Sequence, residues 1–258
     1  MRGVSEIACL LGFDVTEPAE LVLQIAVPSP LTETLSVDAV ELPGRQHYLR
    51  AEPGKLIVEY RATVGPQPAP APVTAFDRIV AMRPSRYCPS DRVTGFAATQ
   101  FGSIGDPTAT VRAITEWVFE HLAYTVGSSG PTTDAIDTLL TGAGVCRDYA
   151  HLVATLCRAL DIPARVAAVY APGLSPMDFH LVVETALDGE WRVWDATRLA
   201  PRQTLIRIAT GRDAADTALA TTLSGMLTMP EMTVLAIADG DLPIDDHVAL
   251  VSLGEAAV

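Results

Sequence analysis

Residues 65–72 read GPQPAPAP, and this run limits the possible folds more than any other stretch of the sequence. Prolines cannot donate backbone hydrogen bonds, and each fixes its own φ angle, so neither a helix interior nor a central strand fits here. We interpret residues 66–72 as a semi-rigid linker. The linker separates segments 1–65 and 73–258. The total of 258 residues suits one large domain or two modest ones.

The segment before the linker has the pattern of an all-β domain. Runs rich in β-branched residues predict strands at 20–27, 34–42 and 55–64, separated by PSP, PG and EPG turns. The opening run MRGVSEIACLLGFDV has an apolar patch that Glu6 interrupts, and no small-residue cleavage site follows it. These residues are therefore expected to form a first strand rather than a signal peptide.

The segment after the linker changes character. Apolar residues at helical spacing predict helices at 106–124 and 132–142, and another that begins near Cys146. Strands are predicted at 162–170, 180–187, 191–197, 232–238 and 247–253. The expected fold class is α+β, with helices packed on an antiparallel sheet in residues 73–258 and a small all-β domain in residues 1–65.

Composition limits the classes of partner. The net charge is −13, with 18 Lys and Arg residues that form no basic cluster, which argues against binding to nucleic acid or to an anionic membrane surface. No apolar run approaches the ~20 residues that span a bilayer. The four cysteines show no CxxC spacing, so neither a disulfide framework nor a zinc site is indicated. A cytoplasmic protein with free thiols and without a cofactor or metal ion is expected.

Cys146 follows Gly-Ala-Gly-Val and opens a predicted helix. A cysteine is nucleophilic as the thiolate, and the unpaired N–H groups and positive dipole end of a helix N-terminus stabilise that anion. Gly142 and Gly144 remove side chains from the approach to it. Taken alone, Cys146 could equally be a small buried hydrophobic residue. A base oriented by a third group is needed to distinguish the two.

His180 is the histidine best placed to be that base. It opens a predicted strand whose hairpin partner contains Asp195, and Asp188-Gly189 between them is a strong signal for a two-residue turn. Such a turn pairs His180 with Thr197 and makes Asp195 a diagonal neighbour at ~7–8 Å, or a direct one if a bulge intervenes. The other histidines have weaker claims: His47, His121 and His247 are expected at the surface, and His151 is turned away from Cys146 on the same helix.

Three separated blocks resemble the bacterial transglutaminase-like superfamily: GVCRDYAHLVATLCRALDIPARVAAVY (144–170), DFHLVVE (178–184) and WRVWDATRLAP (191–201). The segments RPSRYCPSD (83–91) and RIATGRDAADTA (207–218), and the β-rich start, are also similar to bacterial members. The resemblance implies a papain-like core in which Cys146 is the nucleophile, His180 the general base and acid, and Asp195 the residue that orients the imidazole. Cys146 would attack an amide carbonyl, release an amine and leave a thioester.

The same resemblance leaves details of the site open. The Cys146 backbone N–H is one expected oxyanion donor, and Tyr87, Tyr124 and Trp117 are candidates for the second, although each could simply be a packed aromatic. Leu181 and Val182 follow His180 where many relatives carry Ala-Trp or Ala-Val. The sequence has no dense acidic cluster of the kind used by calcium-dependent animal transglutaminases, so a calcium requirement is not implied.

Several nearby residues have simpler interpretations. Arg147 and Asp148 are expected on an exposed first helical turn, where Asp148 would interact with the helix dipole. Asp178 could face the site or could merely be solvated. Cys9, Cys88 and Cys157 are expected to be structural.

The leading hypothesis is a transglutaminase-like cysteine peptidase or amidase that cleaves peptide-like amides of a peptide or protein substrate through a thioester. The first alternative is an acyl transferase, a transglutaminase or amide synthase, in which an amine resolves the thioester. The second is a catalytically silent binding module that keeps the fold.

Overall fold

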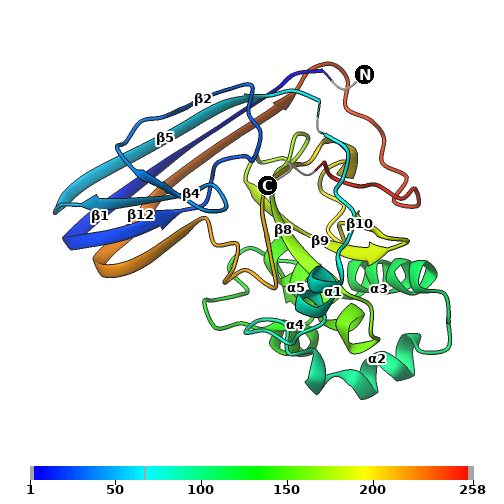
Figure 1. Ribbon diagram of the computed structural model, residues 1–258. Coiled ribbons are helices and arrows are strands. Elements are labelled where there is room, and N and C mark those ends of the chain that lie inside the picture. The colour runs from blue at the N-terminus through cyan, green and yellow to red at the C-terminus, as the bar shows by residue number, and fades with distance from the viewer. Residues whose placement is uncertain (1–2, 67, 255–258) are drawn as a thin grey trace.

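The computed structural model describes residues 3–66 and 68–254. Residues 1–2 of the segment 1–65, linker residue 67, and residues 255–258 of the segment 73–258 lie outside the described residues. The fold is mixed α/β. A long sheet lies on one side of the molecule, a second sheet lies in the middle, and the helices gather on the other side (Figure 1).

The helices are α1 (Ala75–Ala81), α2 (Thr94–Phe101), α3 (Pro107–His121), α4 (Ala135–Thr141) and α5 (Cys146–Ala159), with 3-10 turns at Ser90–Arg92 and Arg202–Thr204. The strands are β1 (Ser5–Leu23), β2 (Thr32–Leu35), β3 (Val40–Leu42), β4 (Gln46–Ala51), β5 (Gly54–Val64), β6 (Ala123–Tyr124), β7 (Ala143–Gly144), β8 (Ala164–Tyr170), β9 (Phe179–Leu187), β10 (Glu190–Trp194), β11 (Ile206–Gly211) and β12 (Ala220–Ala238).

The first sheet has the strand order β2-β5-β1-β4-β3, and β12 pairs with β1 along its whole length. Ser5 lies opposite Ala238 and Leu23 opposite Ala220, so two strands far apart in the sequence are neighbours in the same sheet. The strand predicted at 232–238 is the end of β12, and the run predicted at 20–27 begins as the end of β1. The division into domains at residues 66–72 stays a prediction.

Two predictions for the first sheet were wrong. The predicted strand 34–42 is broken into β2 and β3, because β2 pairs with β5 at one edge of the sheet and β3 with β4 at the other. Strand β4 was not predicted, and its His47, expected at the surface, is 8% exposed. A short polar run does not show that the chain crosses from one edge of the sheet to the other, nor that His47 is buried.

The second sheet has the order β10-β9-β8-β11, with antiparallel neighbours throughout. Asp188 and Gly189 have φ angles of 53° and 80°, and Leu187 lies opposite Glu190, which confirms the predicted two-residue turn. The predicted register holds as far as Trp194 opposite Val183, where β10 ends, so the strand predicted at 191–197 is shorter than expected and Thr197 does not pair with His180. The strand predicted at 247–253 is absent from the described residues. That segment instead accepts a hydrogen bond from Val193 at Val251 and buries Leu253.

Helix α5 lies at the centre of the helical layer. It contacts α2, α3 and α4 as well as β8 and β9, and it is buried on nearly every side. The apolar stripe predicted from its sequence is therefore only part of its buried surface. The opposite face of the second sheet packs on the first sheet, where Tyr170 of β8 and Phe179 of β9 join the apolar cluster of β1 and β5. None of the described helices is long and apolar enough to cross a membrane.

Candidate active site

Cys146 is the first residue of α5 and is partly exposed. The turn before it is held by Asp148, whose Oδ2 accepts a hydrogen bond from the Val145 N–H at 2.8 Å. Asp148 is fully buried and ion-paired with Arg147, because the turn folds it inward; the expectation of an exposed first turn was wrong. A Cβ on Gly144 would lie 2.6 Å from the Asp148 Cβ, so glycine is required for this approach.

His180 is the second residue of β9, at the end of the strand far from the Asp188-Gly189 turn, and its side chain lies near Cys146. Its Nε2 and Asp195 Oδ2 are 2.8 Å apart, and both side chains are about 1% exposed. The Cys146 side chain lies close enough to the imidazole to favour its protonated form. Because Asp195 holds Nε2, Nδ1 is the ring nitrogen left for the thiol. The structure therefore brings Cys146, His180 and Asp195 together in one chain of contacts.

Asp195 is fixed by Thr197 as well as by His180. Its Oδ1 accepts hydrogen bonds from the Thr197 N–H at 2.9 Å and from the Thr197 hydroxyl at 2.7 Å. Burial would raise the pKa of Asp195, but these donors and the neighbouring imidazole keep it below its usual value. The sequence predicts Thr197 only as the hairpin partner of His180. Nothing in the local sequence pattern indicates that Thr197 bonds to Asp195.

The charge of the imidazole follows from the same contacts. Burial of His180 opposes protonation, but the Asp195 carboxylate and the Cys146 sulfur outweigh it and raise the pKa of His180 to about 10. A protonated His180 at neutral pH is therefore favoured, with the carboxylate on one side and the sulfur on the other.

Tyr124 brings a further polar group to Cys146. It lies on β6, which pairs with β7 immediately before α5, with Tyr124 opposite Gly144. The Tyr124 hydroxyl lies close to the backbone N–H and the side chain of Cys146. Burial and the nearby Cys146 raise the pKa of Tyr124 to about 12, so the hydroxyl keeps its proton at neutral pH. Of the three aromatic candidates for an oxyanion donor, Tyr124 is the one whose hydroxyl interacts with Cys146 among the described residues.

Comparisons with known proteins identify the family of the chain. Residues 94–196, which include all three side chains, match the model of the transglutaminase-like superfamily. A protein from Cytophaga hutchinsonii, provisionally named a cysteine protease, has a crystal structure that is 33% identical, covers 97% of this chain and 96% of its own, and superposes with a TM-score of 0.88. The chain belongs to the transglutaminase-like superfamily.

Two further relatives are more distant. An uncharacterized protein of Mycobacterium leprae is 27% identical over 57% of this chain, and the match spans 55% of that protein, so the chain corresponds to about half the length of this curated relative. The periplasmic domain of TgpA from Pseudomonas aeruginosa is 21% identical, covers 74% of this chain and 87% of its own, and has a TM-score of 0.44.

In this member of the superfamily, the other aromatic candidates have packing roles. The Tyr87 hydroxyl donates to the Pro131 carbonyl, and its ring stacks on His151 at 5.2 Å. His151 is fully buried, and its Nε2 accepts the Ala214 N–H. Trp117 stacks on His121 and packs edge-on against Phe96 and Phe101.

Cys146 also differs from the remaining cysteines. Cys9, Cys88 and Cys157 are buried, and burial raises the pKa of Cys9 and Cys88 to about 11 and that of Cys157 to about 12. All four are free thiols. Within residues 3–66 and 68–254, no three His, Cys, Asp or Glu side chains are grouped so that they could share a metal ion.

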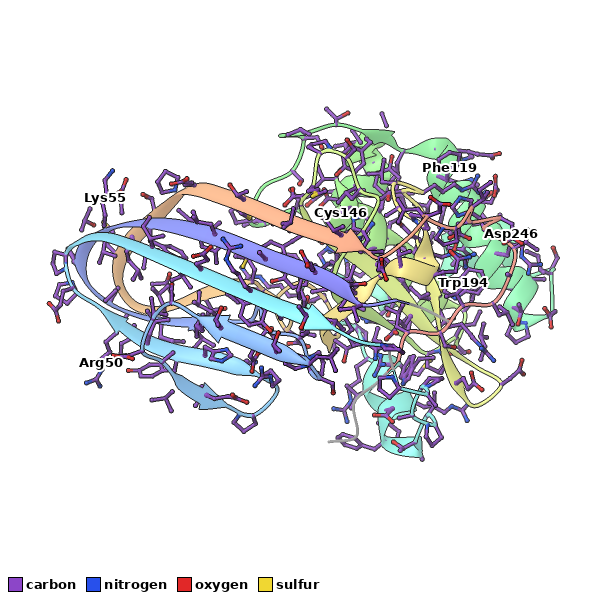
Figure 2. All side chains as sticks on the ribbon, turned by 90° about the horizontal axis from the view of Figure 1, so that it is seen from above. Arg50, Lys55, Phe119, Cys146, Trp194 and Asp246 are labelled. Carbon is purple, nitrogen blue, oxygen red and sulfur yellow. The ribbon has the colours of Figure 1, made fainter. Side chains whose placement is uncertain are left out.

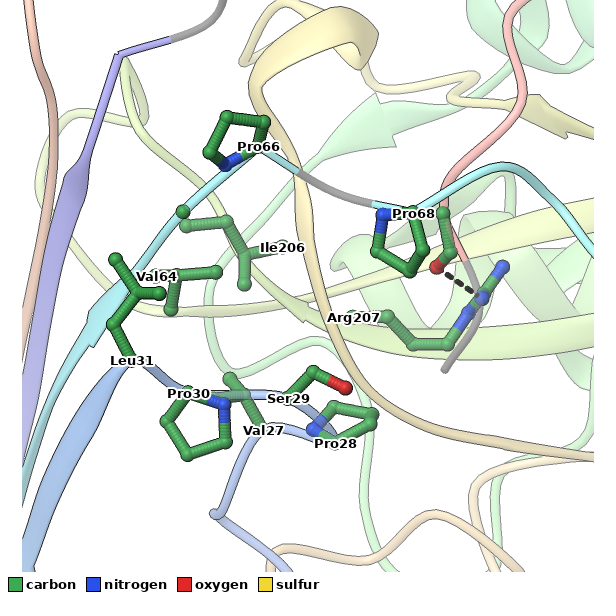
Figure 3. Close-up of a pocket in the computed structure, with 12 residues that line it drawn as sticks. Val27, Pro28, Ser29, Pro30, Leu31, Val64, Pro66, Pro68, Ile206 and Arg207 are labelled. Atoms are coloured by element: carbon green, nitrogen blue, oxygen red, sulfur yellow. Dashed lines mark hydrogen bonds between the residues drawn. The ribbon is translucent and has the colours of Figure 1, made fainter. Parts of the chain in front are cut away.

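A separate cavity of ≈ 390 Å³ lies between the first sheet and β11 (Figure 3). Prolines and apolar side chains from the Val27–Leu31 and Val64–Pro68 segments form its walls, with Ile206 and Arg207 opposite. Arg207 donates to the Gly254 carbonyl and pairs with the buried Glu184. Cys146, His180 and Asp195 do not line it.

Proposed function

We propose that the protein is a cysteine-dependent peptidase or amidase in which Cys146, His180 and Asp195 act as a catalytic triad. The observation that carries the proposal is the buried 2.8 Å contact between His180 Nε2 and Asp195 Oδ2, with Cys146 beside the same imidazole at the start of α5. The full-length relative that is provisionally named a cysteine protease supports a peptide or protein amide as the substrate.

The proposed reaction begins with attack of the Cys146 thiolate on the amide carbonyl carbon. The C–S bond forms, and the carbonyl oxygen gains the electron pair of the broken π bond. The Cys146 N–H and the Tyr124 hydroxyl are the two donors proposed for this oxyanion, since both lie next to the nucleophile. The imidazolium of His180 then gives its proton to the nitrogen, the C–N bond breaks, and the amine leaves.

The thioester is then hydrolysed, and His180 acts as a base in this step instead of as an acid. Neutral His180 accepts a proton from water while the water oxygen attacks the carbonyl carbon. The C–S bond breaks, the carboxylic acid departs, and the thiolate–imidazolium pair is restored. If a primary amine takes the place of water, the product is a new amide, as in the acyl transferase alternative. Asp195 keeps the imidazole in one orientation through both steps.

The first test is the rate of iodoacetamide alkylation at each cysteine between pH 4 and pH 9, for the wild type and for His180→Ala. N-acetylcysteine in the same solution is the reference, since a free thiol titrates near ~8.5. We expect Cys146 to be labelled at least ~10-fold faster than the reference below pH 7, and this advantage to disappear in the variant. Equal rates for Cys146 and the reference would contradict an activated thiolate.

The second test separates hydrolysis from transfer. Peptides rich in amide side chains are incubated with the wild type or with Cys146→Ala, with and without excess methylamine, and the products are identified by mass spectrometry. New carboxylates favour the peptidase or amidase, and methylamides favour the acyl transferase. Identical products from the wild type and Cys146→Ala would favour the silent binding module.

The cytoplasmic location remains a prediction, supported by the four free thiols.

A further inference from the structure

Asp178 is a carboxylate beside the candidate active site that the proposed reaction does not use. It lies two residues before His180, in the segment between β8 and β9, and is exposed. Its Oδ1 accepts the Phe179 N–H at 2.7 Å, which fixes the side chain next to the strand end. Asp178 forms no ion pair with a lysine or arginine in the part of the chain that the structure describes.

The other carboxylates at the site are neutralised. Asp195 is paired with His180, and Asp148 with Arg147, and both are buried. Asp178 differs in both respects, because it is exposed and lacks such a partner. It is therefore an acidic group beside the site that an incoming molecule can meet.

Two neighbours define where this carboxylate acts. Asp178 lies two residues before His180, immediately before β9, near enough for its charge to act on the His180 imidazolium and on the Tyr124 hydroxyl. Tyr124 is 45% exposed and Met177 43% exposed. The solvent-facing surface next to Cys146 thus combines a carboxylate with a half-exposed aromatic ring.

A carboxylate and an aromatic ring together suit an ammonium group. The carboxylate supplies the opposite charge, and the ring face attracts cations through its quadrupole. The net charge of −13 extends this preference to the approach of the molecule from solution. An anionic group would meet the opposite conditions at the same place.

The side of the substrate follows from the role of His180. In the proposed reaction His180 delivers a proton to the leaving nitrogen and takes one from the incoming nucleophile, so the amine part of the substrate lies at His180. Asp178 interacts with His180 and therefore adjoins the amine part rather than the acyl chain.

We propose that Asp178 is a specificity-determining residue that selects an amine part carrying an additional ammonium group, such as a lysine side chain or a short diamine. The inference rests on the proposed function for its meaning, but the charge preference at Cys146 can be measured independently of turnover. Asp178 acts by binding charge and takes no part in the transfer of protons.

The test uses three thiol reagents that differ in charge: the cation 2-aminoethyl methanethiosulfonate, the neutral methyl methanethiosulfonate and the anion 2-sulfonatoethyl methanethiosulfonate. With each, the Cys146 thiolate attacks the sulfenyl sulfur, a disulfide forms, and methanesulfinate leaves. The readout is the ratio of the second-order rate constants for the cation and the anion at low ionic strength. A ratio cancels any change in the intrinsic reactivity of Cys146.

We expect Asp178→Asn to lower this ratio by ~3- to 10-fold and to make it less sensitive to salt. Asparagine keeps the acceptor for the Phe179 N–H, so the strand end is preserved. Asp188→Asn is the matched control: it removes the same charge from an exposed position at the other end of β9, and asparagine suits its φ of 53°.

An unchanged ratio in Asp178→Asn, or an equal fall in Asp188→Asn, would overturn the inference, because the preference would then come from the overall charge of the protein. Failure of the proposed function would appear differently, as a neutral-reagent rate at Cys146 no higher than that of N-acetylcysteine. The two failures are thus distinguishable in one set of measurements.

Discussion

At His180, burial and charge act in opposite directions on the same proton. The folded protein holds that proton to about pH 10, against about 6.5 for an ordinary histidine, because Asp195 and Cys146 outweigh desolvation. The stability that this pair contributes is therefore fully present below pH 6.5 and is lost as the pH rises through about 10. For Asp195, whose pKa is lowered, the contribution is present above the ordinary value of 3.8 and is lost as the pH falls below it.

Asp195→Asn tests this assignment at a single residue. The substitution keeps the shape of the side chain and removes the charge, so we expect the pKa of His180 to fall by ~1–3 units. The imidazole NMR signals of His180, followed from pH 5 to pH 11, provide the measurement. Asp188→Asn should leave the titration where it is. A His180 pKa that stays near 10 in Asp195→Asn would show that the carboxylate is not its main support.

At the scale of elements, the start of α5 depends on the close approach of Gly144 to Asp148. A Cβ at Gly144 would displace Asp148 from the Val145 N–H, so we expect Gly144→Ala to lower the free energy of unfolding by ~1–3 kcal/mol and to slow Cys146 alkylation. Gly130→Ala is the control, because a Cβ there meets nothing within 4 Å. Chemical denaturation and alkylation rates check both variants, and equal behaviour of the two would rule out the steric explanation.

The elements also show how far sequence patterns reach. The Asp188-Gly189 turn is set by local backbone geometry, so the hairpin register as far as Trp194 opposite Val183 could be predicted from the sequence. His180 and Asp195 meet beyond the paired part of this hairpin. The burial of Asp148 could not, because it depends on a turn that folds the side chain under Val145. Tyr124 appeared only as one of three aromatics, since its contact with Cys146 requires the pairing of β6 with β7.

At the scale of the whole molecule, the two sheets share one packing layer. Tyr170 packs in the core of the first sheet and donates a hydrogen bond from its hydroxyl to the Ile25 carbonyl at 2.9 Å, while Ala168 contacts both cores. Figure 2 shows Arg50 and Lys55 at the far end of the first sheet from Cys146. We therefore expect the sheets to unfold in a single transition even where the perturbation lies far from the site.

Gly225→Ala tests this cooperativity. Gly225 has a φ of 82°, and a Cβ there would lie 2.2 Å from the Pro18 carbonyl oxygen, so the substitution disturbs β1 against β12. All three tryptophans (Trp117, Trp191 and Trp194) lie outside the first sheet and report on the rest of the molecule. We expect the melting temperature seen by tryptophan fluorescence to fall by ~5–10 °C.

Gly240→Ala is the control for this substitution. It has a similar φ of 84° but open space around the Cβ, so it should shift the same midpoint by only ~2–4 °C. A fluorescence midpoint that does not move in Gly225→Ala, while the first sheet melts earlier by circular dichroism, would show that the two sheets unfold independently.

The pairing of β1 with β12 has a consequence for biosynthesis. Ser5 finds its partner in Ala238, so β1 keeps one edge open while the more than two hundred residues between them are added. Cys146, His180 and Asp195 are all translated before that partner exists. Contacts of such long sequence separation form slowly, and domains that fold during synthesis normally complete from the N-terminus onward. Here the sheet that supports β8 and β9 is completed only once β12 is made, so the nucleophile is present in the nascent chain well before its surroundings are finished.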